Sequence, residues 1–321
     1  MTPGAARKPA VSVVVLSYDR PRRLRSALES IRAQSLPPTE ILVIDNPSQS
    51  SDQIRRECAA VSGVNLLSTG RNVGFAGGMN FGLSLAGCEL VLLTEDDLVL
   101  EPHCLETLVS ALQECPGAGV VAPIIYNFAR RTVRCAGGDV SLGGVFKYTL
   151  RDWDAPSPSG DLTQPREVQF VPGAILLART AVLRDVGGFR DEFFMYNEDI
   201  ELCLRLRRSG YRIVLVPRAS CFHFEPTQSA APAIEFHKYK NLIALYLLHA
   251  PWRVLPEFAL RYGILTALAG DVDRRVVIRA WLWAVWNGPR LVAERLGWRQ
   301  RAAIQPQRRA LPSAMMMGEG A

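Results

Sequence analysis

Five short apolar runs, separated by helix-like segments, occupy the first 125 residues and constrain the fold more than any other feature. Continuously apolar runs of this length are typical of strands buried on both faces of a sheet. The predicted strands are VSVVVLS (11–17), EILVID (40–45), VNLLS (64–68), LVLLT (90–94) and GVVAPII (119–125). Helical patterns lie between them at 21–34, at 79–86 and from about Pro102 onward. This alternation predicts an α/β fold with a mostly parallel sheet and helices on both faces.

Polar clusters follow four of these strands. They are Ser17-Tyr18-Asp19-Arg20, Asp45-Asn46, Arg71-Asn72 and Glu95-Asp96-Asp97. In sheets of this kind, ligands bind beyond the carboxyl ends of the strands. We therefore expect the four clusters to meet at one edge of the sheet and to form the functional site.

The acidic stretch TEDD (94–97) concentrates negative charge at the end of a predicted buried strand. Desolvated carboxylates are unfavourable unless a positive charge compensates them. The residues alone leave two interpretations open. The acids bind a divalent cation, or they form a solvated cluster that caps a helix ahead of Pro102.

A glycine-rich turn, GRNVGFAGGMNFG (70–82), precedes this acidic stretch. Glycine lets the backbone approach a ligand closely, and the start of the following helix favours a phosphate. The turn matches neither GxGxxG nor a P-loop. An ordinary strand-to-helix turn is therefore an equally good interpretation.

A second acidic cluster lies in FFMYNEDIELCLRLRRSGY (193–211). We expect a helix from about Asn197 to Ser209, capped by Asn197, with acids in its first turn and Glu201 and Arg205 as an i,i+4 pair. These structural roles explain the acids. The aromatic residues just ahead of them suggest the wall of a cleft, where a carboxylate could act as a general base.

The rest of the first 230 residues is less regular. Residues 126–166 are rich in Gly, Pro and Ser, with a mobile loop expected at 153–161, and an apolar run at 168–179 is broken by Pro172-Gly173. Two short strands are predicted at 212–217 and 220–224. His223 lies on the second strand, and its role depends on whether the TEDD stretch is close by.

The C-terminal third carries the basic surplus. From residue 231 onward, 13 Lys and Arg face 6 Asp and Glu, a net +7, whereas the whole chain is +6 and the first 230 residues are therefore −1. Residues 234–298 have a helical pattern with breaks expected at Pro251, Pro256 and Pro289. No run reaches the roughly 18 uncharged apolar residues of a membrane-spanning helix. An integral membrane segment is therefore not expected.

Arginines alternate with large apolar residues in this region, a mixture suited to a helix lying on an anionic lipid surface. The residues are Arg274, Arg275, Arg279, Arg290 and Arg295, with Trp281, Trp283, Trp286 and Leu291. In the alternative interpretation, the tryptophans pack onto the rest of the protein and the arginines face water. Nucleic-acid binding suits this mixture less well.

Cysteine usage and the N-terminus indicate the compartment. The seven cysteines are scattered without a CxxC pair, and MTPGAARKPA has no apolar core of a signal peptide. Both observations predict reduced thiols in a cytoplasmic protein.

Taken in order, these motifs resemble the inverting family 2 glycosyltransferases of the GT-A fold. The resemblance covers about residues 10–225 and is carried by SVVVLSYDRP, ILVIDN, GRNVGFAGGMNFG, TEDD, VPGAILLAR, VGGF, FFMYNEDIELCLRLRRSGYRIVLVP and the histidine after them. Within this family the chain most resembles the rhamnosyltransferases and galactofuranosyltransferase-like enzymes of bacterial cell-surface polysaccharide synthesis. The resemblance implies a nucleotide-sugar donor, a glycan or polyprenyl-linked acceptor and a divalent metal, Mg²⁺ or Mn²⁺. It also implies a cytoplasmic enzyme at the inner face of the cell membrane.

The resemblance also implies roles for particular residues. Asp199 matches the catalytic base, with Glu198 beside it. The implied metal ligands are Glu95, Asp97 and His223, within a DxD-type motif. The implied donor-binding residues are Ser17, Tyr18, Arg20, Asp45, Asn72, Gly74, Gly78 and Asp96.

The sequence departs from the family pattern at three places. Pro47 stands where glycine is frequent after Asp45-Asn46, the metal motif begins with Thr94-Glu95, and Arg190 stands where aspartate is frequent. The second departure leaves open which two of the three acids contact the metal.

The predicted division of the chain is a disordered N-terminus (1–10), a GT-A catalytic domain (11–230), a helical region that is a candidate for membrane association (231–300) and a flexible tail (301–321).

Two other functions are alternatives to glycosyl transfer. A sugar nucleotidyltransferase would show a GxGxR-like loop after the first strand, where this chain has SYDRPRRL. A non-catalytic nucleotide- or lipid-binding scaffold would be expected to lack the acids at 95–97 or Asp199, which are present. The oligomeric state stays open.

Overall fold

A computed structural model describes residues 9–143, 146–150, 154–155, 157, 163–224, 232–269 and 272–304 of the protein. Its elements are, in chain order, β1 (Val11–Ser17), α1 (Pro21–Arg32), β2 (Glu40–Asp45), α2 (Ser51–Ala59), β3 (Val64–Ser68), α3 (Gly74–Leu85), β4 (Leu90–Glu95), β5 (Leu98–Leu100), α4 (Cys104–Glu114), β6 (Ala118–Asn127), β7 (Val133–Cys135), β8 (Gly138–Ser141), β9 (Lys147–Leu150), β10 (Arg166–Val168), β11 (Ile175–Arg179), α5 (Thr180–Asp185), η1 (Asp191–Phe193), α6 (Glu198–Arg208), β12 (Arg212–His223), α7 (Pro232–His249), η2 (Trp252–Val254), α8 (Leu255–Ala259), η3 (Leu260–Leu265), α9 (Thr266–Ala269) and α10 (Arg274–Ile304). The predicted disordered N-terminus, the 153–161 loop and the flexible tail lie mostly outside the described residues. Residues 301–304 of that tail continue α10.

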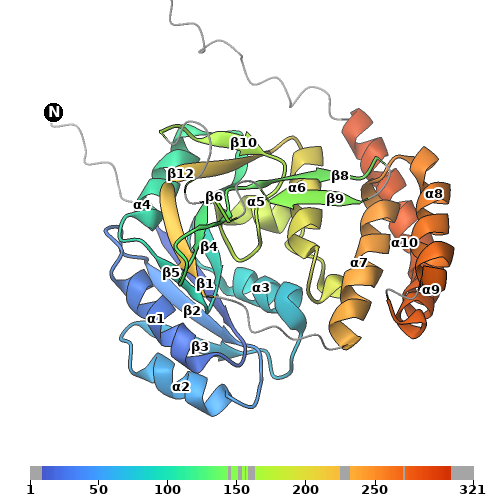
Figure 1. Ribbon diagram of the computed structural model, residues 1–321. Helices are drawn as coiled ribbons and strands as arrows, with labels where there is room; N and C mark the ends of the chain where they lie inside the picture. The colour runs from blue at the N-terminus through green and yellow to red at the C-terminus, as the bar shows by residue number, and fades with distance from the viewer. Residues whose placement is uncertain are drawn as a thin grey trace, which may run out of the picture.

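A single large sheet forms the centre of the molecule (Figure 1). Its main path runs β10-β12-β6-β11-β4-β1-β2-β3, with β5 paired to β12 and β7 to β6. Strands β4, β1, β2 and β3 are mutually parallel, whereas β11 runs antiparallel to both of its neighbours. The α/β fold with parallel central strands is therefore confirmed.

Helices cover both faces of this sheet. On one face α1, α2 and α4 bury apolar side chains against Val13 and Val15 of β1, and on the other α3, α5 and α6 pack against Val14 and Leu16. Successive residues of a strand point to opposite faces. Burial on both faces thus explains why the parallel strands are continuously apolar in the sequence.

Two predicted features differ from the structure. Helix α3 begins at Gly74 rather than near residue 79, and Gly82 within it lets the helix approach β1 so closely that a Cβ there would lie 2.2 Å from Val14. The two predicted short strands at 212–224 form one strand, β12, which pairs with β6 on both sides of an irregularity between Val216 and Ser220. The two halves therefore share one strand partner.

Two of the three predicted helix breaks were also wrong. Pro289 lies inside α10, and Pro256 lies in the first turn of α8, where no intrahelical N–H is needed. Pro251 does separate α7 from the next helical segment.

The C-terminal helices pack directly on the sheet-bearing part of the protein. Ala244, Leu245 and Leu248 of α7 and Leu291 of α10 belong to the same apolar cluster as the residues of α3 and α6. A further cluster joins α7, α8 and α10 to one another. The C-terminal helical region is confirmed, and the exact division into domains stays a prediction. Within the described residues, we find no helix with the length and apolar character to cross a membrane.

Candidate active site

The carboxyl ends of four strands lie side by side, as predicted. Ser17 at the end of β1 pairs with Asp45 of β2, Asp45 pairs with Ser68 of β3, and Leu16 pairs with Glu95 of β4. Because these strands are parallel, their ends meet at one edge of the sheet. The polar clusters named from the sequence are thereby brought together.

The three consecutive acids have different partners. The Asp96 carboxylate accepts hydrogen bonds from the Ser17 hydroxyl at 2.7 Å and from the Tyr18 backbone N–H at 3.1 Å. The Arg20 guanidinium lies between all three acids, with its Nη1 atom 3.3 Å from Glu95, 3.2 Å from Asp96 and 2.8 Å from Asp97. Burial, only partly offset by Arg20, raises the pKa of Asp96 to about 7. Arg23 also lies 3.4 Å from Asp97, so two guanidinium groups face three acids at this strand end.

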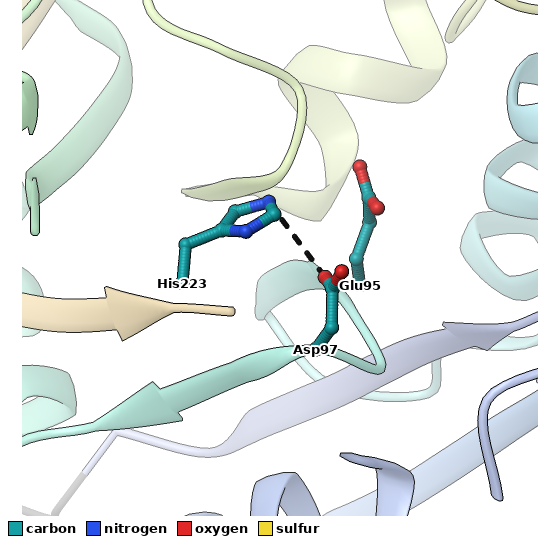
Figure 2. A group of neighbouring side chains, drawn as sticks. All are labelled: Glu95, Asp97 and His223. Carbon is teal, nitrogen blue, oxygen red and sulfur yellow. Dashed lines mark ion pairs between the residues drawn. The ribbon is translucent and has the colours of Figure 1, made fainter. Parts of the chain in front are cut away.

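Glu95, Asp97 and His223 form a group that can hold a metal ion (Figure 2), with donor atoms all within 4.8 Å of one another. His223 comes from the far end of β12 and reaches the acids because β12 pairs with β5, where His223 lies opposite Leu98. His223 is 7% exposed and Asp97 only 1%. Asp97 and His223 are about 125 positions apart in the sequence, and the pairing of β5 with β12 brings them together.

The donor chemistry of this group fits a divalent cation. The His223 Nδ1 atom lies 2.6 Å from the Phe224 carbonyl oxygen, which can only accept, so Nδ1 carries the proton and the lone pair of a neutral ring is on Nε2. Nε2 lies 3.7 Å from Asp97 Oδ1, and that oxygen is buried with no hydrogen-bond partner among the described residues. With the ring neutral, two acceptors face each other, and a cation between them would remove their repulsion. Carboxylate oxygen with imidazole nitrogen is a common ligand set for such ions.

The loop after β3 is tied to the end of β2 by Asn46, which the sequence placed in a polar cluster with Asp45 but for which it indicated no role of its own. Asn46, 3% exposed, donates from Nδ2 to Asn72 Oδ1 at 3.0 Å and accepts the backbone N–H of Val73 at 2.8 Å. Asn72 in turn accepts the backbone N–H of Gly74 at 2.9 Å. The only sequence signal for Asn46 was its position directly after a strand end. Asp45, beside it, is buried and accepts a hydrogen bond from Ser51.

The two glycines predicted to bind the donor have different surroundings. Gly74 has a φ of +75°, and a Cβ there would lie 2.4 Å from the carbonyl oxygen of Phe194. Gly78 lies within α3, where a Cβ would lie 2.4 Å from Leu16 of β1. Gly78 therefore serves close packing of the helix on the sheet, and Gly74 serves contact with the segment ahead of α6.

A cavity of about 610 Å³ opens beside the loop after β3. Asn72 and Phe194 line it, together with Arg71 and the outer side of α3. None of the three candidate metal ligands lines it, so the cavity extends the site away from the acidic cluster rather than containing it.

Glu198 and Asp199 begin α6; Glu198 is buried and Asp199 is half-buried. Asp199 Oδ2 accepts the backbone N–H of Gly173 at 3.1 Å, and Oδ1 accepts that of Ile200 at 2.7 Å. One Glu198 oxygen, Oε2, has no hydrogen-bond partner among the described residues. Asn197 does not cap the helix with its side chain, contrary to the prediction, because its backbone is left-handed with a φ of 63°.

Burial raises the pKa of both carboxyl groups, but unequally. For Asp199, the N–H groups of Gly173 and Ile200 partly offset the effect of burial. For Glu198 the neighbouring Asp199 carboxylate adds to it, as does Glu95, so the pKa of Glu198 lies well above its ordinary value. When two coupled acids differ in this way, one keeps the proton and the other the charge. The larger rise at Glu198 favours the proton on Glu198 and the negative charge on Asp199.

Comparison with known proteins agrees with this geometry. The family described as glycosyltransferase like family 2 matches residues 9–236. The N-acetylglucosaminyl-diphospho-decaprenol L-rhamnosyltransferase of Mycobacterium tuberculosis is 26% identical over 280 residues, covering 80% of this chain and 90% of the relative. The O-antigen biosynthesis protein RfbC of Myxococcus xanthus is 29% identical over 252 residues, covering 76% of this chain but only 19% of that much longer protein.

The fold likewise matches solved glycosyltransferase structures. The crystal structure of GalNAc-T7 with UDP, GalNAc and Mn²⁺ superposes with a TM-score of 0.66 at 12% identity, covering 80% of this chain and 51% of that one. The match to the family extends over most of the chain and the arrangement of the sheet agrees with it. The chain therefore belongs to glycosyltransferase family 2 and is a glycosyltransferase of the GT-A fold.

Proposed function

We propose that this enzyme transfers a sugar from a nucleotide-diphosphate donor, a UDP- or dTDP-sugar, to a hydroxyl of a glycan or polyprenyl-linked acceptor, with inversion at the anomeric carbon. The observation that carries the proposal is the placement of two acidic groups with different chemistry in one site. Glu95, Asp97 and His223 suit a divalent cation, and Asp199 suits a base. The similarity to a decaprenol-linked rhamnosyltransferase supports a lipid-linked acceptor in cell-surface polysaccharide synthesis.

The chain's own residues provide most of the chemistry. A Mg²⁺ or Mn²⁺ ion held by Glu95, Asp97 and His223 would supply positive charge to the leaving diphosphate. Arg20 adds a fixed positive charge at the same strand end. The loop from Asn72 to Gly74, held by Asn46, and the buried Asp45 form the nucleotide side of the site.

Asp199 completes the reaction. The acceptor hydroxyl gives its proton to the Asp199 carboxylate as its oxygen attacks the anomeric carbon. The bond between that carbon and the diphosphate breaks, and its electron pair leaves with the diphosphate. Attack from the side opposite the leaving group inverts the configuration.

Donor binding should require a divalent metal and should depend on Asp97. We expect Mn²⁺ together with a UDP- or dTDP-sugar to raise the midpoint of thermal unfolding, because a ligand that binds only the folded state stabilises it. Asp97→Asn should abolish most of this Mn²⁺-dependent shift, while Asp52→Asn on the exposed side of α2 should leave it intact. A GDP-sugar serves as the specificity control. Unchanged donor affinity of Asp97→Asn in calorimetry, with metal still required, would move the metal site elsewhere.

A membrane contact through the C-terminal helices is part of the proposal. Trp281 and Trp283 pack inside the helical region, Leu291 is fully buried, and Arg295 is 2% exposed. Trp286 is instead 87% exposed. Around it lies an apolar face made of Ile278, Leu282, Val285 and Trp286 of α10, at helical spacing. The exposed arginines Arg274, Arg275 and Arg279 on the same helix suit anionic headgroups.

We expect the full chain to sediment with anionic liposomes at low ionic strength and to be released by salt, since salt screens exposed charges. Replacing both Leu282 and Trp286 by Ser should weaken this binding several-fold, because apolar contact is lost. Leu85→Ser, an exposed leucine at the end of α3, is the matched control. If the wild-type protein stays in the supernatant at low salt, the acceptor is better sought among soluble glycans.

A further inference from the structure

The segment between η1 and α6 is strained and carries the candidate catalytic pair at its end. Phe194, Tyr196 and Asn197 have positive φ angles of 64°, 70° and 63°. Such angles are unfavourable for most residues with a Cβ. Glu198 and Asp199 follow directly. Their position therefore depends on whatever holds this segment in its strained conformation.

One side chain from the C-terminal region meets most of this segment's carbonyl groups. The Asn241 Nδ2 atom on α7 lies 2.9 Å from the carbonyl oxygen of Phe193, 2.8 Å from that of Met195 and 2.7 Å from that of Tyr196. Asn241 is fully buried at 0% exposure. The Phe193 carbonyl also accepts the backbone N–H of Met195 at 2.7 Å, whereas those of Met195 and Tyr196 accept no backbone N–H among the described residues, so the amide supplies their donor.

Neighbouring residues of α7 hold the same segment. The His237 ring stacks on Phe194 with centroids 4.7 Å apart, and the Lys240 ammonium donates to the carbonyl of Glu192. The carbonyl of Phe194 accepts the backbone N–H of Ala76 in α3. The segment is thus fixed between α3, which lies beside the nucleotide side of the site, and α7.

The chemistry of this contact is specific to an amide. Three acceptors converge on one nitrogen, and a neutral amide N–H₂ has two hydrogens to share among them. A carboxylate at the same position would place negative oxygens against three carbonyl oxygens. An apolar side chain of similar size would leave buried carbonyls without a donor, which is costly.

We propose that Asn241 is a positioning residue for catalysis, which holds the Phe193–Tyr196 backbone so that Asp199 faces the acceptor hydroxyl. The inference rests on the proposed role of Asp199 as the base. It places a functional residue beyond position 236, where the match to the family ends. Helix α7 thereby contributes to the position of the catalytic groups.

The test compares Asn241→Leu and Asn241→Ser with Tyr239→Phe. The last removes a hydrogen bond from α7 to the Tyr262 carbonyl, away from the segment, and controls for damage to the helix. We expect both Asn241 variants to lower kcat by roughly 10- to 100-fold, the cost of small misplacement of a catalytic group, with little change in donor Kd. Hydrogen exchange at residues 193–200 should be faster in both variants than in Tyr239→Phe.

A double variant separates positioning from general loss of stability. If Asn241 acts through Asp199, Asn241→Ser combined with Asp199→Asn should be no slower than Asp199→Asn alone. Additive losses, or an Asn241→Ser enzyme with normal kcat and unchanged exchange, would overturn the proposal. Should Asn241→Leu not fold, the Ser variant decides alone. If hydrogen exchange is faster in the Asn241 variants but Asp199→Asn stays active, the role of Asp199 as the base is refuted. The conclusion that Asn241 holds the Phe193–Tyr196 backbone would then still stand.

Discussion

Replacing Asp199 by Asn should lower turnover by roughly 10²-fold or more while leaving donor binding nearly unchanged, the scale expected when a general base is lost. The substitution is close to isosteric. Asp199 accepts the Gly173 and Ile200 N–H groups on different oxygens, and a carboxamide has one acceptor oxygen, so the variant can keep one of these two bonds. What is lost is the negative charge that takes the proton. Turnover is measured with saturating donor, and donor affinity by calorimetry.

Glu198→Gln distinguishes the two acids of the pair. Because burial and the Asp199 carboxylate raise the pKa of Glu198 well above its ordinary value, we expect Glu198 to hold the proton of the pair, and a neutral glutamine imitates that form. We expect a much smaller loss of turnover than for Asp199→Asn. Asp185→Asn, an exposed acid at the end of α5, controls for the change of net charge. If Glu198→Gln proves the more damaging variant, or if the product keeps the anomeric configuration of the donor, Asp199 is not the base of an inverting transfer.

The parallel part of the fold could be predicted from local sequence patterns, because each of its strands and helices is encoded by a short continuous stretch of the chain. Strands β1, β2 and β4 carry continuous apolar runs, and the edge at which the polar ends of β1 to β4 meet follows from parallel pairing. The grouping of Ser17, Asp45 and Glu95 required only that rule.

Features that depend on distant partners were predictable only through resemblance or not at all. His223 reaches Asp97 through the β5–β12 pairing, which no local pattern encodes. Asn241 lies in an ordinary helical stretch, and its three acceptors are more than 40 positions away. Gly78 looked like part of a ligand-binding turn, but glycine is also required where a helix packs closely on a strand. Spacing alone does not separate these two uses.

The partners of Arg190 could not be predicted from local sequence patterns either. It stands where the family often has aspartate, and the structure pairs it with Glu192, Glu201 and Glu294 of α10. Glu201 is fully buried and is also bonded to Arg205 at 2.6 Å and to His249 of α7 at 3.2 Å. This ion cluster joins α6, which carries the proposed catalytic pair, to the two long C-terminal helices.

Glu201→Gln should lower the free energy of unfolding by about 3 kcal/mol, because removing one partner leaves buried charge uncompensated. Glu257→Gln is the matched control. Glu257 also forms an i,i+4 pair with an arginine, Arg261, but both side chains are 51% exposed, so that variant should change stability by less than about 1 kcal/mol. Urea unfolding measures both, and a shifted midpoint at constant slope identifies a change of stability.

The pH dependence of this effect has a definite sign. Burial alone would raise the pKa of Glu201, but Arg205, His249 and Arg190 more than offset it, and the pKa lies well below its ordinary value. A depressed folded-state pKa contributes stability above the unfolded-state value of about 4.3 and loses it as the pH falls below that value. The difference between wild type and Glu201→Gln should therefore be largest near neutral pH and shrink below about pH 4. A Glu201→Gln enzyme no less stable than Glu257→Gln at pH 7 would show that the cluster contributes nothing to holding α6 against α7.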